Sequence, residues 1–306
     1  MSTLTHIANP LYDVVFRYMM EDNRVARLFL SAVLGEEVEE LIFSPTEYSR
    51  KLGGEAGITV TRMDFNARIR QADGQRRVVL IELQKAKYHH QLMRFRSYLG
   101  KQYQNPQHIG PGGSPLPIYP VYILAESFTT EKVPVIRVSR EYTDGATQAP
   151  TGRHPFIEAL THDATVIQAE HLRGQRRTVL ERFLSIFDQS SQTDAKGHIL
   201  ALSEEDFPEV YRPVIRRLHK ALQHPKIEEE MDLEDEVLNE FHKKDELLAA
   251  ALQREEDARQ QAEEARTAQH GMIRRLHAMG MSLAQIASVA GMEEAEVEAL
   301  INTSGG

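Results

Sequence analysis

The sequence contains no cysteine. This absence excludes disulfides, cysteine-held iron–sulfur clusters, thiolate zinc sites and cysteine nucleophiles. Long hydrophobic runs are also missing: the runs are short, such as Val78–Ile81, far below the roughly 20 apolar residues that span a bilayer. The N-terminal residues show no basic segment followed by an apolar one, which argues against a secretory signal. The sequence therefore predicts a soluble, cytoplasmic protein that does not interact with a membrane.

The chain has enough apolar material for a core, because 41% of its 306 residues are hydrophobic and 26% are charged. We expect three segments: a mixed α/β domain over residues 1–225, an acidic long helix or weak coiled coil over 226–276, and a small helical hairpin over 277–306. The long helix either pairs two copies into a homodimer or stays single and solvated. The terminal hairpin resembles the front of a helix-turn-helix, but its acidic second helix opposes docking on DNA and favours packing or assembly.

Charge is distributed unevenly. Residues 226–266 contain six basic and fifteen acidic side chains, whereas residues 62–101 contain ten basic and three acidic ones. The overall net charge of −9 thus comes from the tail, and the front half holds a basic island. Such an island is either a phosphate-binding footprint or a solvated arginine-rich surface.

Local signals predict a helix, hairpin, helix, strand order, which is a mixed α/β pattern. We expect residues 1–52 to be largely helical, with one helix beginning at Asn9-Pro10 and another over 23–34 that ends at Gly35. Asp73-Gly74 between two extended runs predicts a hairpin. A helix over 88–103 follows, then strands over 118–124 and 164–169, and helices over 175–188, 204–223 and from 227 onward. Pro120 favours an edge position or a bulge for its strand.

Two polar residues interrupt the apolar strand that follows the hairpin turn. Side chains alternate along a strand, so Glu82 and Gln84 project from one face and Leu83 from the other. A two-residue loop would place Asp64 opposite Leu83, whereas a three-residue loop ending at Gly74 places it opposite Glu82. We favour the second register, because that loop needs a positive φ at its end and glycine adopts it freely. Two carboxylates and an amide would then converge, and such oxygen donors can hold Mg²⁺ or Mn²⁺.

An aspartate followed by Glu-x-Lys on the next strand of a hairpin is the core motif of the PD-(D/E)XK nucleases. The stretches NPLYDVVFRYMM, RMDF and VVLIELQ, followed by a helix with Arg94 and Tyr98, resemble one branch of that superfamily. This branch is the Rpn-type recombination-promoting nucleases, also called PD-(D/E)XK family transposases. The resemblance covers about residues 8–125 and extends loosely to about 225.

The resemblance implies a restriction-endonuclease-like core, with a mixed central sheet flanked by helices and a C-terminal helical extension. It also implies that Asp64 and Glu82 are metal ligands. Gln84 stands where the superfamily has lysine; an amide can orient a water but adds no positive charge. Lys85 and Lys87 have the wrong strand parity to replace that lysine. Asp13 is either a third acid of the site or a helix-dipole partner in the first turn.

The helix after the hairpin carries a second, polar face, formed by Gln91, Arg94, Tyr98 and Lys101. With Lys87, this face either lines the path of nucleic-acid phosphates or is simply solvated.

Two functions follow from these features. The first is a Mg²⁺- or Mn²⁺-dependent endonuclease that cleaves DNA, with a role in recombination or mobile elements implied by the resemblance. The second is a non-catalytic nucleic-acid-binding or assembly protein that retains the nuclease fold, which the missing lysine and the acidic tail motivate. RNA is a third, weaker candidate substrate.

Overall fold

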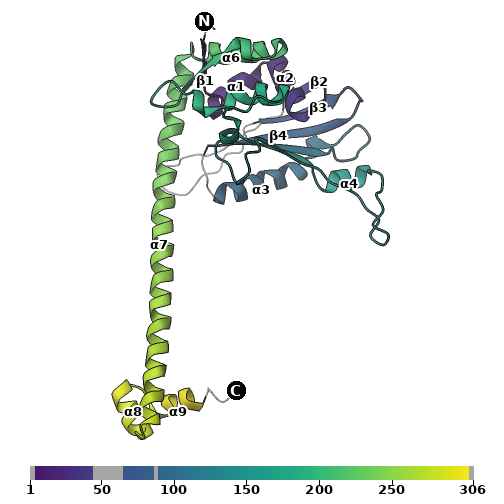
Figure 1. Ribbon diagram of the computed structural model, residues 1–306. Helices are drawn as coiled ribbons and strands as arrows, with labels where there is room; N and C mark the ends of the chain where they lie inside the picture. Colours follow the sequence, from purple (N-terminus) through teal and green to yellow (C-terminus); the bar gives the residue numbers. More distant parts are fainter. Residues whose placement is uncertain (1–3, 44–64, 86–88, 303–306) are drawn as a thin grey trace. The chain divides into compact units, whose positions relative to one another are not determined.

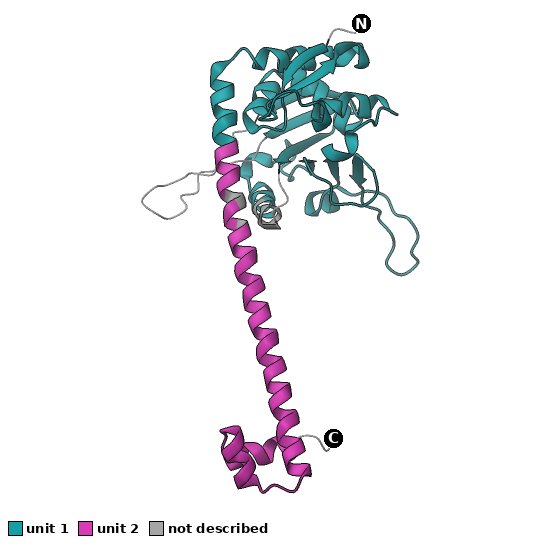
Figure 2. Ribbon diagram, turned by 60° about the vertical axis from the view of Figure 1, so that its left-hand side comes forward, with its two compact units in different colours: residues 1–234 teal, residues 235–306 magenta. Residues whose placement is uncertain are grey.

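The computed structural model describes residues 4–43, 65–85 and 89–302, and the side chains of residues 89–94, 241, 242 and 245 lie outside this description. The chain divides into two compact units, residues 1–234 and 235–306, which Figure 2 shows in different colours. The division falls inside a long helix, α7, rather than at residue 225. Each unit has buried hydrophobic residues of its own.

Unit 1 is built on a six-stranded mixed sheet with the strand order β2-β3-β4-β5-β7-β6. The pairs β2–β3, β3–β4 and β6–β7 are antiparallel, whereas β4–β5 and β5–β7 are parallel. The strands are β2 (Val38–Phe43), β3 (Phe65–Gln71), β4 (Arg76–Gln84), β5 (Ile118–Leu124), β6 (Val135–Val138) and β7 (Ala164–Gln168). The predicted mixed α/β class and the β3–β4 hairpin are confirmed.

A second, two-stranded sheet joins the two ends of unit 1. Strand β1 (Leu4–Ala8) pairs antiparallel with β8 (Ile199–Ser203). The first segment was expected to be helical, and no strand was predicted for the second. The expectation of a largely helical segment over residues 1–52 is therefore wrong for β1 and β2.

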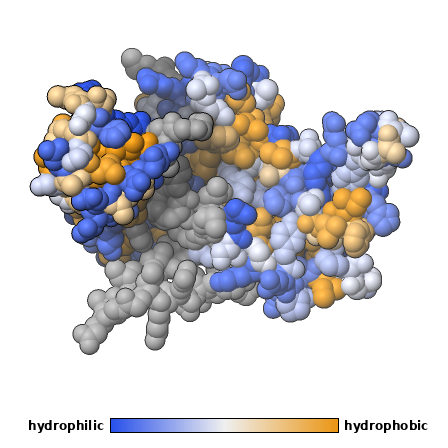
Figure 3. All heavy atoms as spheres, turned by 90° about the horizontal axis from the view of Figure 1, so that it is seen from below, coloured by the Kyte–Doolittle hydropathy of each residue, from blue (hydrophilic) through white to orange (hydrophobic). Residues whose placement is uncertain are grey.

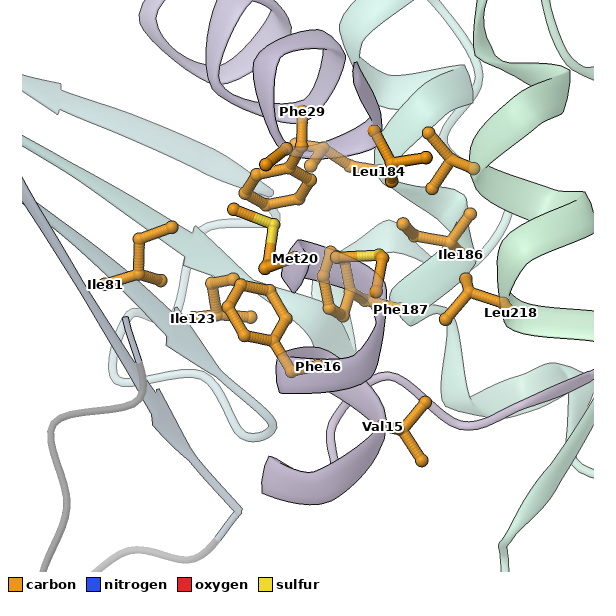
Figure 4. Close-up of a cluster of buried hydrophobic side chains, with 14 of the residues drawn as sticks. Val15, Phe16, Met20, Phe29, Ile81, Ile123, Leu184, Ile186, Phe187 and Leu218 are labelled. Atoms are coloured by element: carbon orange, nitrogen blue, oxygen red, sulfur yellow. The ribbon is translucent and has the colours of Figure 1, made fainter. Parts of the chain in front are cut away.

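Helices cover both faces of the six-stranded sheet (Figure 1). One face packs against α1 (Asp13–Glu21) and α2 (Asn23–Leu34), and α6 (Arg212–Ala221) contacts these two helices and β1. The other face carries α3 (His89–Tyr103) and α4 (Pro155–Leu160). The larger hydrophobic cluster lies on the α1 and α2 side, and Figure 4 shows Phe16 and Phe29 at its centre beside Ile81 and Ile123 of the sheet. A smaller cluster of Val78 and residues of β4, β5 and α3 fills the opposite side.

The short elements after β7 differ from the predicted helices. Helix α5 covers only Val179–Leu184, and 3₁₀ turns take up much of the rest of this region. These turns, with one that follows α3, are Pro106–His108, Ala169–Leu172, Ser185–Phe187, Gln189–Ser191, Glu204–Asp206 and Glu209–Tyr211. The predicted helix over 204–223 is present as α6 in its second half only, because Pro208 interrupts the preceding stretch and Pro213 fits only the first turn of a helix.

The two N-terminal helices differ in how well local sequence signals predicted their ends. Helix α2 covers the predicted residues, with Asp22 accepting hydrogen bonds from two backbone amides and Gly35 ending the helix at φ 75°. Helix α1, in contrast, begins at Asp13 and not at Asn9-Pro10. The side-chain oxygen of Asn9 accepts from the amide of Leu11, and its amide group donates to the carbonyl of Gly197. Asn9 therefore fixes the turn between β1 and α1.

Pro120 lies in an interior strand, so the expectation of an edge strand or a bulge is wrong. The carbonyl of Pro117 accepts from Val78 of β4, and alternation then directs the amide position of residue 120 away from β4. On that side, β7 pairs with β5 only from Val121 onward. The missing N–H of Pro120 therefore removes no hydrogen bond from either ladder.

Unit 2 consists of most of α7 (Pro225–Ala278) together with α8 (Leu283–Ala290) and α9 (Glu294–Asn302). At the start of α8, Ser282 and Gln285 form a capping box, and Gly291 ends α8 at φ 67°. Leu247, Leu248 and Leu252 of α7 are 72%, 59% and 58% exposed. A homodimer through this helix stays a prediction. No helix in the described part of the chain is long and apolar enough to cross a bilayer.

Candidate active site at the end of strand β4

The two faces of strand β4 differ toward its end: one stays apolar, and the other ends in two polar residues. Val79, Ile81 and Leu83 belong to the larger hydrophobic cluster on the α1 and α2 side. Val78 and Leu80 face the α3 side, and alternation places Glu82 and Gln84 on that same face. The Glu82 side chain is buried, with 4% of the residue exposed, whereas Gln84 is partly exposed.

The β3–β4 hairpin has the three-residue register that the sequence favoured. The amide of Gln71 donates to the carbonyl of Gln75 at 2.9 Å, and Gly74 adopts φ 83°. Phe65 consequently pairs with Ile81. Asp64, the residue before Phe65, lies outside the described residues, so its approach to Glu82 stays a prediction.

A tyrosine lies beside Glu82, and sequence reasoning did not find it. Tyr122 is the register neighbour of Glu82 on the parallel strand β5, and its ring contacts that of Phe95 at 4.4 Å between centroids. Burial, and then the charges of Glu82 and Tyr103, raise the pKa of the Tyr122 phenol above its usual value. The Tyr103 hydroxyl lies 2.8 Å from Nδ1 of His162. Alternation along residues 118–124 places Tyr122 on this face only together with the parallel pairing of β4 and β5. The sequence did not predict this pairing.

Lys85 lies on the other side of the sheet, as strand alternation predicts. Its ammonium nitrogen is 3.1 Å from the centroid of the Tyr12 ring and 3.7 Å from a carboxylate oxygen of Glu234. These contacts hold Lys85 next to α1, on the face opposite Glu82. Lys85 therefore does not approach the face that carries Glu82 and Gln84.

Asp13 occupies the first turn of α1. It shares a partner, Glu234, with Lys85. The second oxygen of Glu234 accepts from the backbone amide of Asp13 at 3.0 Å. Carboxylates at this end of a helix are stabilised by the unpaired amides and by the helix dipole. This placement matches the dipole interpretation of Asp13, and a role as third metal ligand stays a prediction.

Helix α3 buries one residue of the polar face that the sequence suggested. Tyr98 is 8% exposed and packs with Phe95 and Leu99 in the smaller hydrophobic cluster. It follows Phe95 by three residues, which is close to one helical turn, so both rings reach the sheet. Tyr98 is therefore a core residue and not part of an exposed binding face. Lys101 is exposed.

Three other residues of the expected binding face lie outside the structural description. The side chains of Gln91 and Arg94 and the whole of Lys87 are outside the described part of the structure. Within that part, no three His, Asp or Glu side chains are grouped so that they could hold a metal ion. Asp64 lies outside that part.

No protein-family model, curated protein or solved structure matches this chain. Its function therefore has to be inferred from its own residues and from the resemblance that its motifs carry.

A buried polar cluster connects β3 to the end of α3, next to the face that holds Glu82. The amide group of Asn66 donates to the side-chain oxygen of Gln102 at 3.1 Å, and Nδ1 of His108 donates to the Gln102 carbonyl at 3.1 Å. All three residues are at most 3% exposed. This cluster fixes the end of α3 against the central hairpin and so helps to position the surface around Glu82.

We expect acid to weaken this cluster through His108. Burial lowers the pKa of His108 below its usual value of 6.5; its hydrogen bond to Gln102 opposes this shift and the charge of Arg68 adds to it. Below about pH 6.5 the unfolded chain therefore takes up the proton more readily than the folded chain, and stability falls until the folded pKa is passed. The melting temperature of the wild type should decrease more steeply between about pH 7.5 and pH 5 than that of His108→Gln. Parallel curves would show that His108 is not the responsible group.

Proposed function

We propose that the chain is a metal-dependent endonuclease of the PD-(D/E)XK type, of the Rpn-like branch, that hydrolyses phosphodiester bonds in DNA. The observation that carries this proposal is a buried glutamate on the face of a central strand, with Gln84 two residues on. The hairpin register leads back along β3 to Asp64, the other acid of the motif. The order of hairpin, helix and parallel strand around these residues agrees with the resemblance.

The residues of this face suit a divalent cation. Carboxylate and amide oxygens are the hard donors that Mg²⁺ and Mn²⁺ prefer. Glu82 and, from the sequence, Asp64 would hold the metal, and Gln84 would orient a water through hydrogen bonds. A bound divalent cation supplies a more acidic water and neutralises charge that develops on a phosphate. The phenol of Tyr122, beside Glu82, contributes a further hydrogen-bonding group on this face.

The alternative is a nucleic-acid-binding or assembly protein that keeps the fold without catalysis. Two features favour it: Gln84 brings no positive charge, and Lys85 is held on the opposite face by Tyr12 and Glu234. RNA instead of DNA is a second alternative for the substrate.

Nicking of supercoiled plasmid by the full chain tests the proposal. We expect cleavage in Mg²⁺ or Mn²⁺ and none in EDTA, because the metal supplies the charge neutralisation that Gln84 does not. Asp64→Ala should abolish this cleavage and leave DNA binding intact. Asp73→Ala, which removes an exposed aspartate from the turn of the same hairpin, is the matched control and should cleave like wild type.

Equal background nicking by all three proteins, with DNA binding retained, would contradict the nuclease and support the non-catalytic alternative. Metal-dependent cleavage of an RNA substrate in place of the plasmid would keep the chemistry and change the substrate.

A further inference from the structure

Three arginines lie on the same sheet face as Glu82, at the opposite end of the hairpin. Arg76 precedes Glu82 by six residues on β4, so both side chains point to one side. Across the ladder, Arg70 pairs with Arg76, and Arg68 pairs with Val78, whose side chain faces α3. Hydrophilic and hydrophobic patches alternate over the side of the protein that includes α3 and α4 (Figure 3).

These arginines line a cavity of about 110 Å³. The loop that follows the Pro106–His108 turn forms one wall, and β2 forms another. Its lining residues are Glu40, Ile42, Arg68, Ile69, Arg70, Arg76, Ile109, Gly110, Pro111 and Leu116. The cavity is large enough for one tetrahedral oxyanion, and three guanidinium groups face one carboxylate in its wall.

Arg70 is already neutralised by protein carboxylates. Its guanidinium forms ion pairs with Glu39 and, at 2.7 Å, with Glu40. These contacts anchor Arg70 to the edge strand β2. They leave the positive charge of the cavity to the other two arginines.

Neither Arg68 nor Arg76 forms an ion pair with a carboxylate among the described residues, although the charge of Arg76 contributes to lowering the pKa of Glu40. Arg68 donates one Nη1 hydrogen bond to the carbonyl of Gln107 at 3.3 Å, and its Nε is buried without an acceptor in the described structure. A buried N–H group without an acceptor costs free energy, which an anion in the cavity would relieve. Guanidinium groups bind the paired oxygens of a phosphate in a fixed, bidentate geometry.

We propose that this arginine cavity binds one backbone phosphate of a nucleic acid. The identity of the anion rests on the proposed function. Six residues of strand at about 3.3 Å each separate Arg76 from Glu82 by roughly 20 Å. Val78 and Leu80, which lie between them on this face, are buried under α3, so the nucleic acid would pass outside this helix. The cavity is therefore a second phosphate contact, apart from the one proposed at Glu82.

The experiment measures the affinity of the full chain for a fluorescent DNA duplex over a range of salt concentrations, in EDTA so that no cleavage occurs. The variants are Arg76→Ser, Arg68→Gln and the double variant. We expect the double variant to bind more weakly, with a salt slope shallower by about 0.9, the value for one phosphate contact. Glu40→Gln should act in the opposite direction and bind DNA more tightly, because it removes a carboxylate from the cavity wall.

Arg24→Ser is the matched control. Arg24 is an exposed arginine of α2 that also lines a cavity, but this helix covers the opposite face of the sheet. The control removes the same charge and should leave the salt slope unchanged. Equal losses in Arg24→Ser and Arg76→Ser would overturn the site, since they would show a non-specific effect of net charge. An unchanged slope in the double variant would also overturn it.

Inorganic phosphate separates the two sources of the anion. If phosphate raises the melting temperature of wild type but not of the double variant, and the DNA slope of the double variant is unchanged, the cavity binds a free oxyanion and the nucleic-acid assignment is wrong. Failure of the cavity is distinguishable from failure of the proposed function. If the chain nicks DNA with metal but the arginine variants bind DNA like wild type, the nuclease proposal stands and the cavity proposal fails. If the arginine variants weaken DNA binding but the chain does not nick DNA, the cavity proposal stands and the nuclease proposal fails.

Discussion

Replacing Glu82 by glutamine is expected to lower metal-dependent DNA cleavage by roughly 10²- to 10³-fold, the loss typical of removing one group that stabilises transition-state charge. The carboxylate is the buried acid on the α3 face of β4, and glutamine has nearly the same shape but no charge. DNA affinity should be unchanged or slightly higher, because the substitution removes a negative charge from the path of the phosphates. Plasmid nicking in Mg²⁺ and duplex binding in EDTA measure the two effects separately.

Folding is not expected to fail in this variant, since a neutral amide is easier to bury than a carboxylate. Glu205→Gln makes the same chemical change at an exposed position and should match wild type in both assays. Cleavage by Glu82→Gln at the wild-type rate would show that Glu82 does not hold the metal. A parallel loss of cleavage and of DNA binding would assign Glu82 a structural role.

The parts of the fold that the sequence predicted are those fixed by neighbouring residues. Asp22 and Gly35 define the ends of α2 through local hydrogen bonds and a left-handed turn. Gly74 fixes the register of the β3–β4 hairpin in the same way, by adopting φ 83°. Because side chains alternate along a strand, this register also determines which residues of β4 share a face with Glu82.

The parts that were not predicted depend on partners far away in the chain. Strand β1 exists because β8, near the other end of unit 1, pairs with it. Pro120 is accepted inside the sheet because β7 begins to pair one residue later. Tyr122 lies beside Glu82 only through the parallel pairing of β4 with β5. No local pattern encodes these pairings, since each depends on how distant elements pack.

The same distinction applies to the charges of the hairpin. Sequence reasoning counted a basic island over residues 62–101 but could not say which arginines are neutralised. In the structure, Arg70 is paired with Glu39 and Glu40, and Arg77 is paired with Glu36. Of the described arginines of the hairpin, Arg68 and Arg76 form no ion pair with a described carboxylate, and both line the cavity beside β2.

The aromatic centre of the larger hydrophobic cluster should dominate the stability of unit 1. Phe29 is fully buried and makes edge-on contacts with Phe16, Phe183 and Phe187 at centroid distances of 5.7, 5.8 and 6.1 Å. Figure 4 shows it above Met20, between α2 and the sheet. Phe29→Ala is expected to cost about 3–5 kcal/mol, because it leaves a cavity and removes these ring contacts.

Denaturant unfolding followed by tyrosine fluorescence measures this loss for unit 1 alone, because all ten tyrosines lie between residues 12 and 211. Phe156→Ala is the matched control: Phe156 lies on α4, is 66% exposed, and should change the free energy of unfolding by no more than about 0.5 kcal/mol. A loss below about 1 kcal/mol in Phe29→Ala would mean that the surrounding helices close the cavity. Helices α1 and α2 would then be free to shift against the sheet, and with them the turn that holds Lys85 away from Glu82.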